Sequence, residues 1–322
     1  MRAARLVEVG KALRIEDLPP LQAGPGMQVV DVRCAALNRR DYWMTTGMYP
    51  GISVPATLGS DGAGVCDGAE VVINPGLAWG PDEAVQGRDF SILGMPVDGT
   101  FAEQVLVPAT QIYPKPAHLT WEEAASLPLA GVTAFRALFR QGGAGPGLRI
   151  LITGIGGGVA LTAMLFALAS HMEVTVTSGS AWKLERAKAL GAVRTANYTD
   201  PAWIQDLVAR NILFDLILDS AGGAHFGDLL KLVKPGGKIV VYGGTLGKIR
   251  NLSPQVLFWR QIAIQGSSMG SPADFTAMLD FVNRHQIRPV VDSVFPLAEA
   301  NLAVGKLEKS DQFGKVILHI SG

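Results

Sequence analysis

The sequence predicts an α/β protein in which a doubly wound parallel sheet is joined to a second, mostly β module. From about Leu148 onward, short aliphatic or β-branched runs alternate with helical segments. This alternation is typical of a parallel sheet with helices on both faces. The first ~120 residues instead place short apolar runs between Pro and Gly turns, which indicates a mostly β module.

Six runs in the second half of the chain are predicted strands, namely 149–153, 173–177, 193–197, 214–220, 238–244 and 262–267. Candidate helices lie between them, near 157–170, 180–190, 201–210, 225–233 and 253–260. The uncharged stretch 150–170 has the length of a membrane span. Its four glycines favour a strand, a glycine turn and a helix instead. The tail from Pro289 returns to strand character, and we expect it to rejoin the β module.

Composition bounds the class of protein. The 322 residues are enough for about two domains, and 48% apolar against 17% charged residues excludes a disordered chain. Lys+Arg 28 balance Asp+Glu 28, so we expect neither nucleic acid nor a membrane as a partner. Two cysteines cannot frame a secreted disulfide scaffold, and only five histidines are present. We expect a cytoplasmic protein.

The strongest local motif is the glycine turn T-G-I-G-G-G-V-A after the first strand of the α/β half. A glycine turn between a buried strand and a helix brings backbone N–H groups close to a pyrophosphate. The strict G-x-G-x-x-G spacing is absent, and G-x-x-G-x-x-A fits instead. A plain tight turn is the alternative interpretation. The predicted dinucleotide contacts in this turn are Gly154, Gly157, Gly158, Val159 and Ala160.

The end of the second predicted strand indicates which dinucleotide binds. An NAD enzyme places Asp or Glu on the adenosine ribose about 20 residues past the turn, but this chain has no acid there until Glu185. Ser178, Ser180 and Lys183 offer donors and a positive charge that suit a 2′-phosphate. Alternatively, Ser180 caps the next helix and Lys183 is a solvated surface residue. The missing acid favours NADP(H).

Several segments in family order carry a resemblance to the medium-chain dehydrogenase/reductase superfamily, in its zinc-free quinone oxidoreductase (zeta-crystallin-like) branch. They are ALNRRDYWMTTGMYPG (36–51), LGSDGAGV (58–65), GTFAEQVLVPA (99–109), EEAASLPLAGVTAFRAL (122–138), the glycine turn, KLERAKALGA (183–192), ANY (196–198), KPGGKIVVYGG (234–244) and QFGKVILHI (312–320). The resemblance implies a GroES-like catalytic domain formed by 1–122 and 266–322. It also implies a central Rossmann NADP-binding domain at 123–265.

The resemblance also shows departures at the zinc positions. Where zinc-dependent members carry a cysteine ligand, this chain has Asn38, and their G-H-E motif is Gly59, Ser60 and Asp61 here. The third ligand region, LPLAGVT, has no Cys or His, and 74–100 lacks the four cysteines of a structural zinc lobe. Asp41 and Asp61 alone do not make a tetrahedral set. We therefore expect no zinc.

The resemblance implies further site residues. Those expected to contact the cofactor are Asn38, Thr133, Ser178, Lys183, Tyr198, Gly243, Gly244, Thr245, Ser267 and Ser268. Tyr42 and Tyr49 fall in the segment that flanks the substrate cleft, where either is a candidate proton donor. The alternative is that both tyrosines are core or interface aromatics. Tyr49 is preferred because it lies in a turn between Gly47 and Pro50.

These observations predict an NADPH-dependent reductase that moves hydride to a quinone or another conjugated carbonyl. The catalytic candidates are Tyr49, Tyr42 and Asn38, with water as an alternative proton source. An enoyl thioester or 2-alkenal reductase of the same fold is the alternative function, and the family implies a homodimer.

Two hypotheses come from other classes. Gly266 to Gly270 spells G-x-S-x-G, with Asp292 and His319 following in the order of a hydrolase triad. However, Ser271-Pro272 is typical of a helix cap and first residue, which leaves Ser268 outside a nucleophile elbow. A cofactor-binding protein without turnover is the other hypothesis. Reduction of a quinone panel, followed by cofactor absorbance, distinguishes all three.

Overall fold

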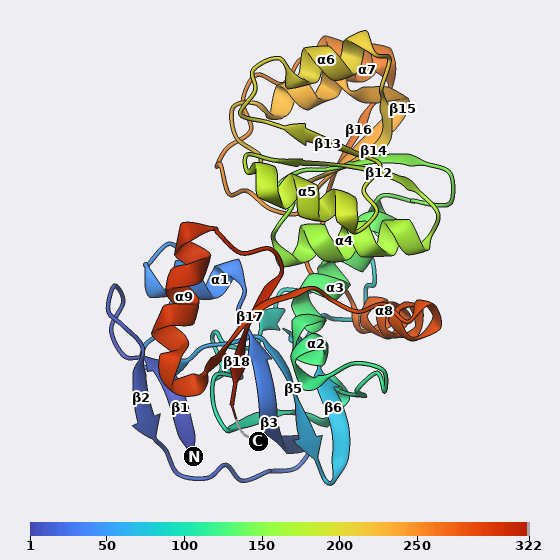
Figure 1. The fold of residues 1–322 in the computed structure, drawn as a ribbon. Helices are drawn as coiled ribbons and strands as arrows, with labels where there is room; N and C mark the ends of the chain where they lie inside the picture. The colour runs from blue at the N-terminus through green and yellow to red at the C-terminus, as the bar shows by residue number, and fades with distance from the viewer. Residues whose placement is uncertain (321–322) are drawn as a thin grey trace. The chain divides into compact units, whose positions relative to one another are not determined.

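The computed structural model describes residues 1–320, which divide into two compact units (Figure 1). Unit 1 comprises Met1–Val132 and the chain from Gly270 onward, and unit 2 is Thr133–Met269. The sequence predicted domain boundaries after residues 122 and 265, whereas the structure divides the units after residues 132 and 269. The first differs because helix α2 (Trp121–Ser126) packs against strands β3 (Met27–Ala36) and β5 (Asp61–Cys66) of unit 1.

Unit 2 is built on one parallel sheet of six strands. Their order is β13-β12-β11-β14-β15-β16, the order of a doubly wound dinucleotide-binding sheet. The strands are β11 (Arg149–Ile152), β12 (Glu173–Ser178), β13 (Arg194–Asn197), β14 (Phe214–Asp219), β15 (Val233–Val241) and β16 (Ala263–Gly266). The α-helices between them are α4 (Gly158–Ala169), α5 (Ala181–Ala189), α6 (Trp203–Ala209) and α7 (Pro254–Arg260). The predicted fold class is confirmed.

One predicted helix is wrong in type. The segment expected as a helix over 225–233 is a short 3-10 helix, η3 (Phe226–Lys231). A Cβ on Gly227 would lie 2.4 Å from the carbonyl oxygen of Asn251, so this chain crossing requires a glycine. Glycine disfavours an α-helix because it loses the most backbone freedom. Strand β15 then begins at Val233, ahead of the K-P-G-G turn, with an irregular register against β14.

The uncharged stretch 150–170 forms β11, the glycine turn and α4, as its glycines predicted. Among residues 1–320, no helix is both long enough and apolar enough to cross a membrane.

Unit 1 is mostly β and contains both ends of the described chain. Its main sheet has the order β10-β6-β5-β3-β18-β17, and β9 also pairs with β3. The strands are β3 (Met27–Ala36), β5 (Asp61–Cys66), β6 (Ala69–Ile73), β9 (Gln104–Pro108), β10 (Ile112–Pro114), β17 (Val291–Pro296) and β18 (Lys315–His319). Since β18 pairs antiparallel with β3, the tail rejoins the β module as predicted.

Two smaller sheets complete the β structure of unit 1. They are formed by β1 (Arg2–Leu6), β2 (Arg14–Asp17) and β4 (Ala56–Thr57), and by β7 (Gly76–Leu77) and β8 (Ser91–Ile92). The remaining helical segments are α1 (Arg39–Thr45), η1 (Ala109–Gln111), α8 (Pro272–His285), η4 (Leu297–Glu299) and α9 (Ala300–Lys309). Helix α3 (Pro128–Phe135) and the π-helical turn η2 (Arg136–Gln141) follow α2.

Each unit has its own apolar core. In unit 1, Leu6, Val32, Phe101 and Leu318 are fully buried, and helix α9 covers them with Leu307. In unit 2, a second cluster includes Leu151, Ile217, Phe226, Ile239 and Ile262. Burial of these side chains is the main driving force for folding each unit.

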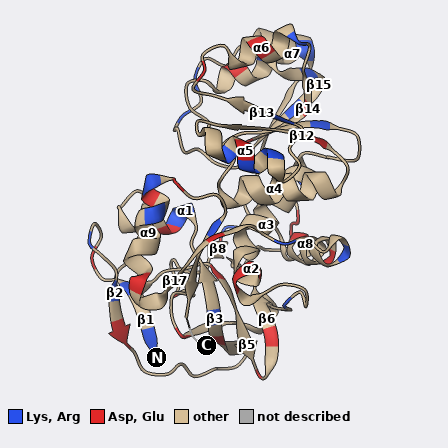
Figure 2. Ribbon diagram, viewed as in Figure 1, with Lys and Arg blue, Asp and Glu red and all other residues tan. Residues whose placement is uncertain are grey.

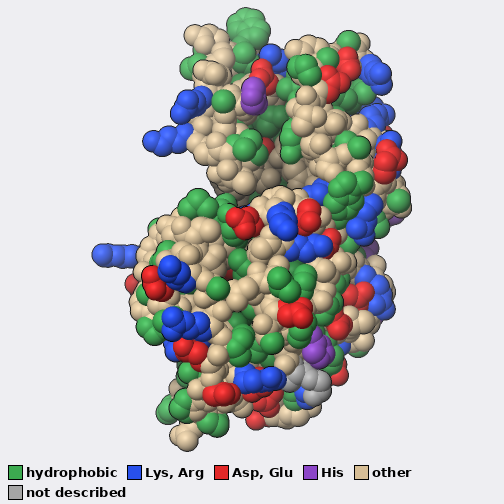
Figure 3. All heavy atoms as spheres, turned by 60° about the vertical axis from the view of Figure 1, so that its left-hand side comes forward, with side chains coloured by type: hydrophobic (Ala, Val, Ile, Leu, Met, Phe, Trp, Pro, Cys, Tyr) green, Lys and Arg blue, Asp and Glu red, His purple; other side chains and the backbone are tan. Residues whose placement is uncertain are grey.

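Lys and Arg positions and Asp and Glu positions are interspersed along the elements of both units (Figure 2). On the face drawn in Figure 3, basic and acidic groups alternate with apolar ones, and no broad area has one sign.

Candidate functional site

The glycine turn connects β11 to α4 in unit 2. Gly154 has a φ of 68°, a left-handed conformation that glycine adopts without strain. Gly157 is the N-cap of α4, and a Cβ placed on it would meet no atom within 4 Å. The N–H groups of Gly158, Val159 and Ala160 form the first turn of α4, where a helix has no intrahelical acceptor for them. Together with the helix dipole, they form a cradle that fits a pyrophosphate.

A hydrogen-bond network joins this turn to the loop after β14. Thr153 Oγ1 donates to Asp219 Oδ1 across 2.8 Å. Asp219 Oδ2 accepts the N–H of Gly222 at 2.7 Å and that of Ala221 at 3.2 Å. Burial raises the pKa of Asp219, and the hydrogen bonds from Gly222 and Thr153 oppose this shift. Asp219 therefore holds together the two loops where the strand order reverses, the usual ligand position in such sheets.

Sequence reasoning missed Asp219. The available signal was an acid at the end of the apolar run F-D-L-I-L-D, where a carboxylate is costly unless it has hydrogen-bond donors.

The end of β12 carries the predicted 2′-phosphate residues. Ser178 is buried, and its Oγ accepts the N–H of Ser180 at 3.2 Å. Ser180 is the N-cap of α5, the alternative role considered for it above. Its side chain accepts no capping hydrogen bond, however. Lys183 is only 9% exposed, with Nζ 5.5 Å from the centroid of the Trp182 ring. The interpretation of Lys183 as a solvated surface residue is therefore wrong.

Tyr198 follows β13 and lies beside the end of β12. Its side chain is exposed, and its ring is so close to Gly179 that a Cβ there would be 3.0 Å from it. The structure therefore brings Tyr198 together with the segment that contains Ser178 and Ser180.

The loop after β15 contains Gly243, Gly244 and Thr245. A Cβ on Gly243 would lie 2.7 Å from the carbonyl oxygen of Ser220, so only glycine fits this approach to the β14 loop. Thr245 Oγ1 donates to the same carbonyl across 3.2 Å. Gly244 lies beside open space. This loop is thus fixed next to the loop that Asp219 organises.

The remaining predicted cofactor residues of unit 2 lie near Met269. Thr133 is buried in α3, and its hydroxyl donates to the Met269 sulfur at 3.9 Å. The Ser267 N–H donates to the Val241 carbonyl at 2.9 Å. Its Oγ is buried and has no hydrogen-bond partner within residues 1–320. Ser268 is exposed.

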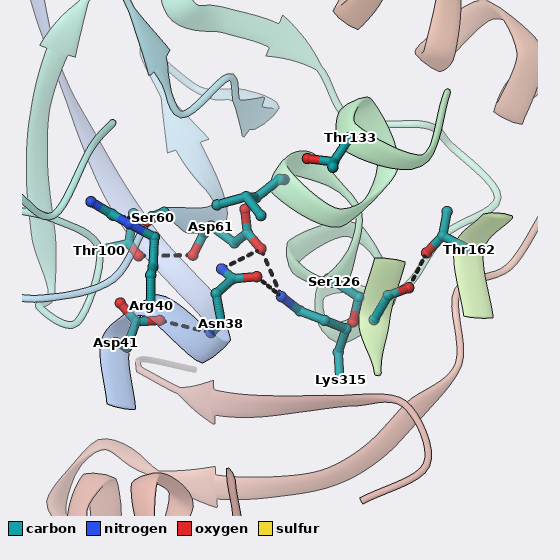
Figure 4. Close-up of polar contacts among 12 residues, drawn as sticks. Asn38, Arg40, Asp41, Ser60, Asp61, Thr100, Ser126, Thr133, Thr162 and Lys315 are labelled. Atoms are coloured by element: carbon teal, nitrogen blue, oxygen red, sulfur yellow. Dashed lines mark hydrogen bonds and ion pairs between the residues drawn. The ribbon is translucent and has the colours of Figure 1, made fainter. Parts of the chain in front are cut away.

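In unit 1, three residues far apart in the sequence form a buried polar network (Figure 4). Asn38 follows β3, Asp61 begins β5, and Lys315 begins β18. Lys315 Nζ donates to Asp61 Oδ2 at 2.8 Å and to Asn38 Oδ1 at 2.6 Å. Asn38 Nδ2 donates to the same Asp61 oxygen at 2.9 Å, and the Leu129 N–H donates to Asp61 Oδ1 at 2.7 Å. Asp61 is fully buried and Lys315 is 4% exposed.

Lys315 is the residue of this network that sequence reasoning missed. It was the single charge at the start of the apolar strand K-V-I-L-H, which suggested an interior partner but not which one.

The helix after Asn38 adds a buried cation. The Arg40 side chain is 7% exposed and donates to Ser60 Oγ at 2.5 Å and to the Leu93 carbonyl at 2.7 Å. Its Nε donates to the Tyr49 hydroxyl at 3.3 Å. Arg40 thus fixes Ser60 and Tyr49 in one polar cluster.

Asp41 lies in the same helix turn and is fully buried. Its Oδ2 accepts the Asn38 N–H at 2.7 Å, while Oδ1 has no hydrogen-bond partner among the described residues. Burial raises the pKa of Asp41 to about 6, although Arg40, the Asn38 hydrogen bond and Lys315 all oppose the shift.

Both candidate tyrosines are partly buried against the core of unit 1. The Arg39 guanidinium lies 5.9 Å from the Tyr42 ring centroid, and that of Arg40 lies 4.9 Å from the Tyr49 ring centroid. Tyr49 differs from Tyr42 because its hydroxyl contacts a buried cation.

The positions that the resemblance assigns to zinc ligands do not form a cation site in this chain. Asp61 and Asn38 both accept from the Lys315 ammonium, and Ser60 accepts from Arg40. A metal ion there would not displace the Lys315 ammonium or the Arg40 guanidinium, and both positive charges would repel it. A primary amide and a hydroxyl are also poor zinc ligands. These residues therefore do not fit a catalytic zinc.

The hydrolase hypothesis fails on the arrangement of its acid and base. His319 pairs with Pro296 at one end of β17, whereas Asp292 lies at the other end, beside the Val291–Lys315 pair. Asp292 accepts the Phe313 N–H at 2.7 Å and pairs with Lys306 at 3.0 Å. It therefore does not orient His319. Ser271 caps α8 through its Oγ, with Pro272 as the first residue, as predicted.

The model of the alcohol dehydrogenase GroES-like domain matches residues 24–117, and that of the zinc-binding dehydrogenase family matches residues 158–284. The chain is 34% identical to the zinc-type alcohol dehydrogenase-like protein YogA of Leptosphaeria maculans, over 92% of this chain and 91% of that protein.

Solved structures agree with these sequence matches. A crystal structure of an NAD-dependent alcohol dehydrogenase has a TM-score of 0.92 and 36% identity, with 100% of both chains covered. The quinone oxidoreductase of Thermus thermophilus, also solved with NADPH, has a TM-score of 0.84 and 29% identity, with 99% of this chain and 100% of that chain covered. This chain is therefore a member of the medium-chain dehydrogenase/reductase superfamily and has the fold of an oxidoreductase.

Proposed function

We propose that the protein is a zinc-independent reductase that moves hydride from NADPH to a quinone or another conjugated carbonyl. The observation that carries this proposal is the ammonium of Lys315, which donates to Asn38 and Asp61, two residues in the segments where the resemblance places the zinc ligands of other members. An alcohol dehydrogenase uses zinc to polarise its substrate oxygen. A conjugated acceptor needs less polarisation because its electrons delocalise as hydride arrives, so positioning contributes more of the acceleration.

The cradle of unit 2 would hold the dinucleotide. Gly157 and the first turn of α4 would bind the pyrophosphate, and Ser178, Ser180 and Lys183 would surround the 2′-phosphate. No acid follows β12 before Glu185 to repel that phosphate. The solved relatives named above include both an NAD-dependent enzyme and one with NADPH, so the cofactor preference rests on this chain's own residues. The bound nicotinamide supplies the hydride.

Tyr49 would supply the proton. Its oxygen accepts from Arg40, which leaves the phenol hydrogen available for donation to the substrate oxygen. The buried guanidinium would then stabilise the phenolate that remains. For Tyr42 the basic neighbour, Arg39, lies over the ring instead, and water is the other proton source.

The experiment is a steady-state panel with NADPH and NADH against 1,4-quinones, enones, 2-alkenals, enoyl thioesters and simple alcohols, before and after dialysis against a chelator. We expect quinone or enone reduction that chelation leaves unchanged. A preference for enoyl thioesters or 2-alkenals would replace the acceptor. Loss of turnover on chelation would overturn zinc independence, and cofactor binding without any turnover would indicate a binding protein.

The same proposal includes a homodimer formed through strand β16. This strand lies at one edge of the parallel sheet, and α7 before it exposes Phe258 at 66% and Trp259 at 83%. An edge strand beside large apolar side chains is typical of a pairing surface. Light scattering should give a dimer mass for the parent and a monomer for Trp259→Glu. Leu302→Glu, at an exposed site in unit 1, is the control. A monomeric parent would contradict this part.

A further inference from the structure

Three potential metal ligands of unit 1 converge outside the site described above. Cys34 lies on β3, His319 on β18 and Glu122 on α2. Cys34 and His319 are direct partners in the antiparallel β3–β18 pairing, so their side chains lie on one face of the sheet. Helix α2 packs against both strands. The fold thus brings a thiol, an imidazole and a carboxylate together from three separate parts of the chain.

The distances suit one ion. A sulfur, a nitrogen and an oxygen of these residues all lie within 4.8 Å of one another, with Cys34 Sγ 3.9 Å from His319 Nδ1. Around tetrahedral zinc the corresponding ligand atoms are about 3.3 to 3.6 Å apart, from Zn–S of ~2.3 Å and Zn–N or Zn–O of ~2.0 Å. Small side-chain rotations would therefore close the set around an ion.

Glu122 is the carboxylate left available by its helix. Glu123, the next residue, forms the capping box with Thr120 and pairs with Arg288 at 2.7 Å. Within residues 1–320, the Glu122 carboxylate forms neither a hydrogen bond nor an ion pair with a basic side chain. One of its oxygens lies within 4.8 Å of the buried sulfur of Cys34. A cation between them would balance the carboxylate and the thiolate.

We propose that Cys34, Glu122 and His319 form a zinc site with a water as fourth ligand. Cys34 is buried, whereas His319 is exposed, so the ion would enter from the His319 side and keep an open position there. One sulfur, one nitrogen and one oxygen ligand favour Zn²⁺ over Mg²⁺ or Ca²⁺. Binding replaces the S–H bond of Cys34 by an S–Zn bond, and the proton passes to solvent.

The bound ion would link β3, from the early part of the chain, and β18, from the late part, to helix α2. The site departs from the sequence-based expectation of a chain without zinc, which rested on the family's ligand positions. It is also independent of the proposed reaction, because Cys34, Glu122 and His319 are not among the residues assigned to hydride or proton transfer.

The test is a titration of reduced, chelator-treated full-length protein with Co²⁺, followed by competition with Zn²⁺. We expect one Co²⁺ per chain, with the visible bands of tetrahedral cobalt and a thiolate-to-cobalt charge-transfer band, all removed by Zn²⁺. Zn²⁺ should also raise the Tm. Cys34→Ser should abolish the charge-transfer band. His319→Gln and Glu122→Gln should each weaken Co²⁺ binding by about tenfold or more.

Matched controls separate the site from adventitious binding. Cys66→Ser removes the other buried cysteine, and Glu123→Gln removes the neighbouring carboxylate, and both should bind Co²⁺ as the parent does. If Cys34→Ser does not fold, His319→Gln still decides, because its side chain is exposed. A cobalt spectrum without a charge-transfer band, or affinities unchanged in both His319→Gln and Glu122→Gln, would overturn the proposal.

Discussion

The ammonium of Lys315 lies 2.8 Å from the carboxylate of Asp61, with both side chains almost completely removed from solvent. The two residues are 254 positions apart in the chain and begin two strands of the same sheet. This ion pair connects the late strand β18 to the start of β5, where the resemblance places a zinc-ligand motif in other members.

Removing the cation should strongly destabilise unit 1. Lys315→Met leaves the Asp61 charge buried without its counterion, and we expect a loss of about 3 to 5 kcal/mol in the free energy of unfolding. The double variant Lys315→Met/Asp61→Asn removes both charges and should recover much of that loss. Urea unfolding of the parent and variants measures both values. Equal destabilisation of the single and double variants would show that the charge pairing is not the cause.

Cofactor preference should depend on Lys183. Replacing it by Glu puts a negative charge where a 2′-phosphate would bind, so kcat/KM for NADPH should fall by about one to two decades. The value for NADH should change much less. Lys188→Glu is the control, because Lys188 is on the same helix but exposed and pairs with Glu185 at 2.9 Å. Equal kcat/KM for the two cofactors in the parent would remove the NADPH assignment.

The proton donor should act on the chemical step. With an enone, Tyr49→Phe should lower kcat by roughly 10²-fold and leave the Kd for NADPH unchanged, because the phenol stabilises charge that develops on the substrate oxygen. With a 1,4-quinone as substrate, kcat of Tyr49→Phe should fall less. Tyr42→Phe is the matched comparison, and single-turnover hydride transfer is the measurement. Unchanged rates in both variants would assign the proton to water or to a cofactor hydroxyl.

Asp41 should make stability depend on pH. Its pKa is raised from 3.8 to about 6 in the folded chain by burial. The unfolded chain therefore loses this proton first, and the free energy of unfolding falls as pH rises from about 4 to about 6. The full loss is on the order of 3 kcal/mol. Asp41→Asn keeps an oxygen that can accept the Asn38 N–H and should lack this fall.

Denaturant unfolding of both proteins between pH 4 and pH 7 measures this difference, and it should grow with pH in favour of the variant. Parallel profiles for parent and variant would show that Asp41 does not titrate as described.

The sequence alone determined the parts of the fold that local pattern controls. All six strands of the parallel sheet, the glycine turn at Gly154 to Ala160 and the cap at Ser271-Pro272 were predictable, because periodicity and turn chemistry act over a few neighbouring residues. The prediction of an α-helix over 225–233 was wrong because Gly227 lies against Asn251, a residue of another segment that local sequence does not reveal.

Only the tertiary structure decided the partners of the buried polar groups. The sequence shows an apolar strand that begins with Lys315 and another that ends in Asp219, but not that Lys315 pairs with Asp61 or that Asp219 binds Thr153. The meeting of Cys34, Glu122 and His319 likewise depends on the pairing of β3 with β18 and on the packing of α2. Strand order and register set these encounters, and both result from burial across the whole sheet rather than from any local run of residues.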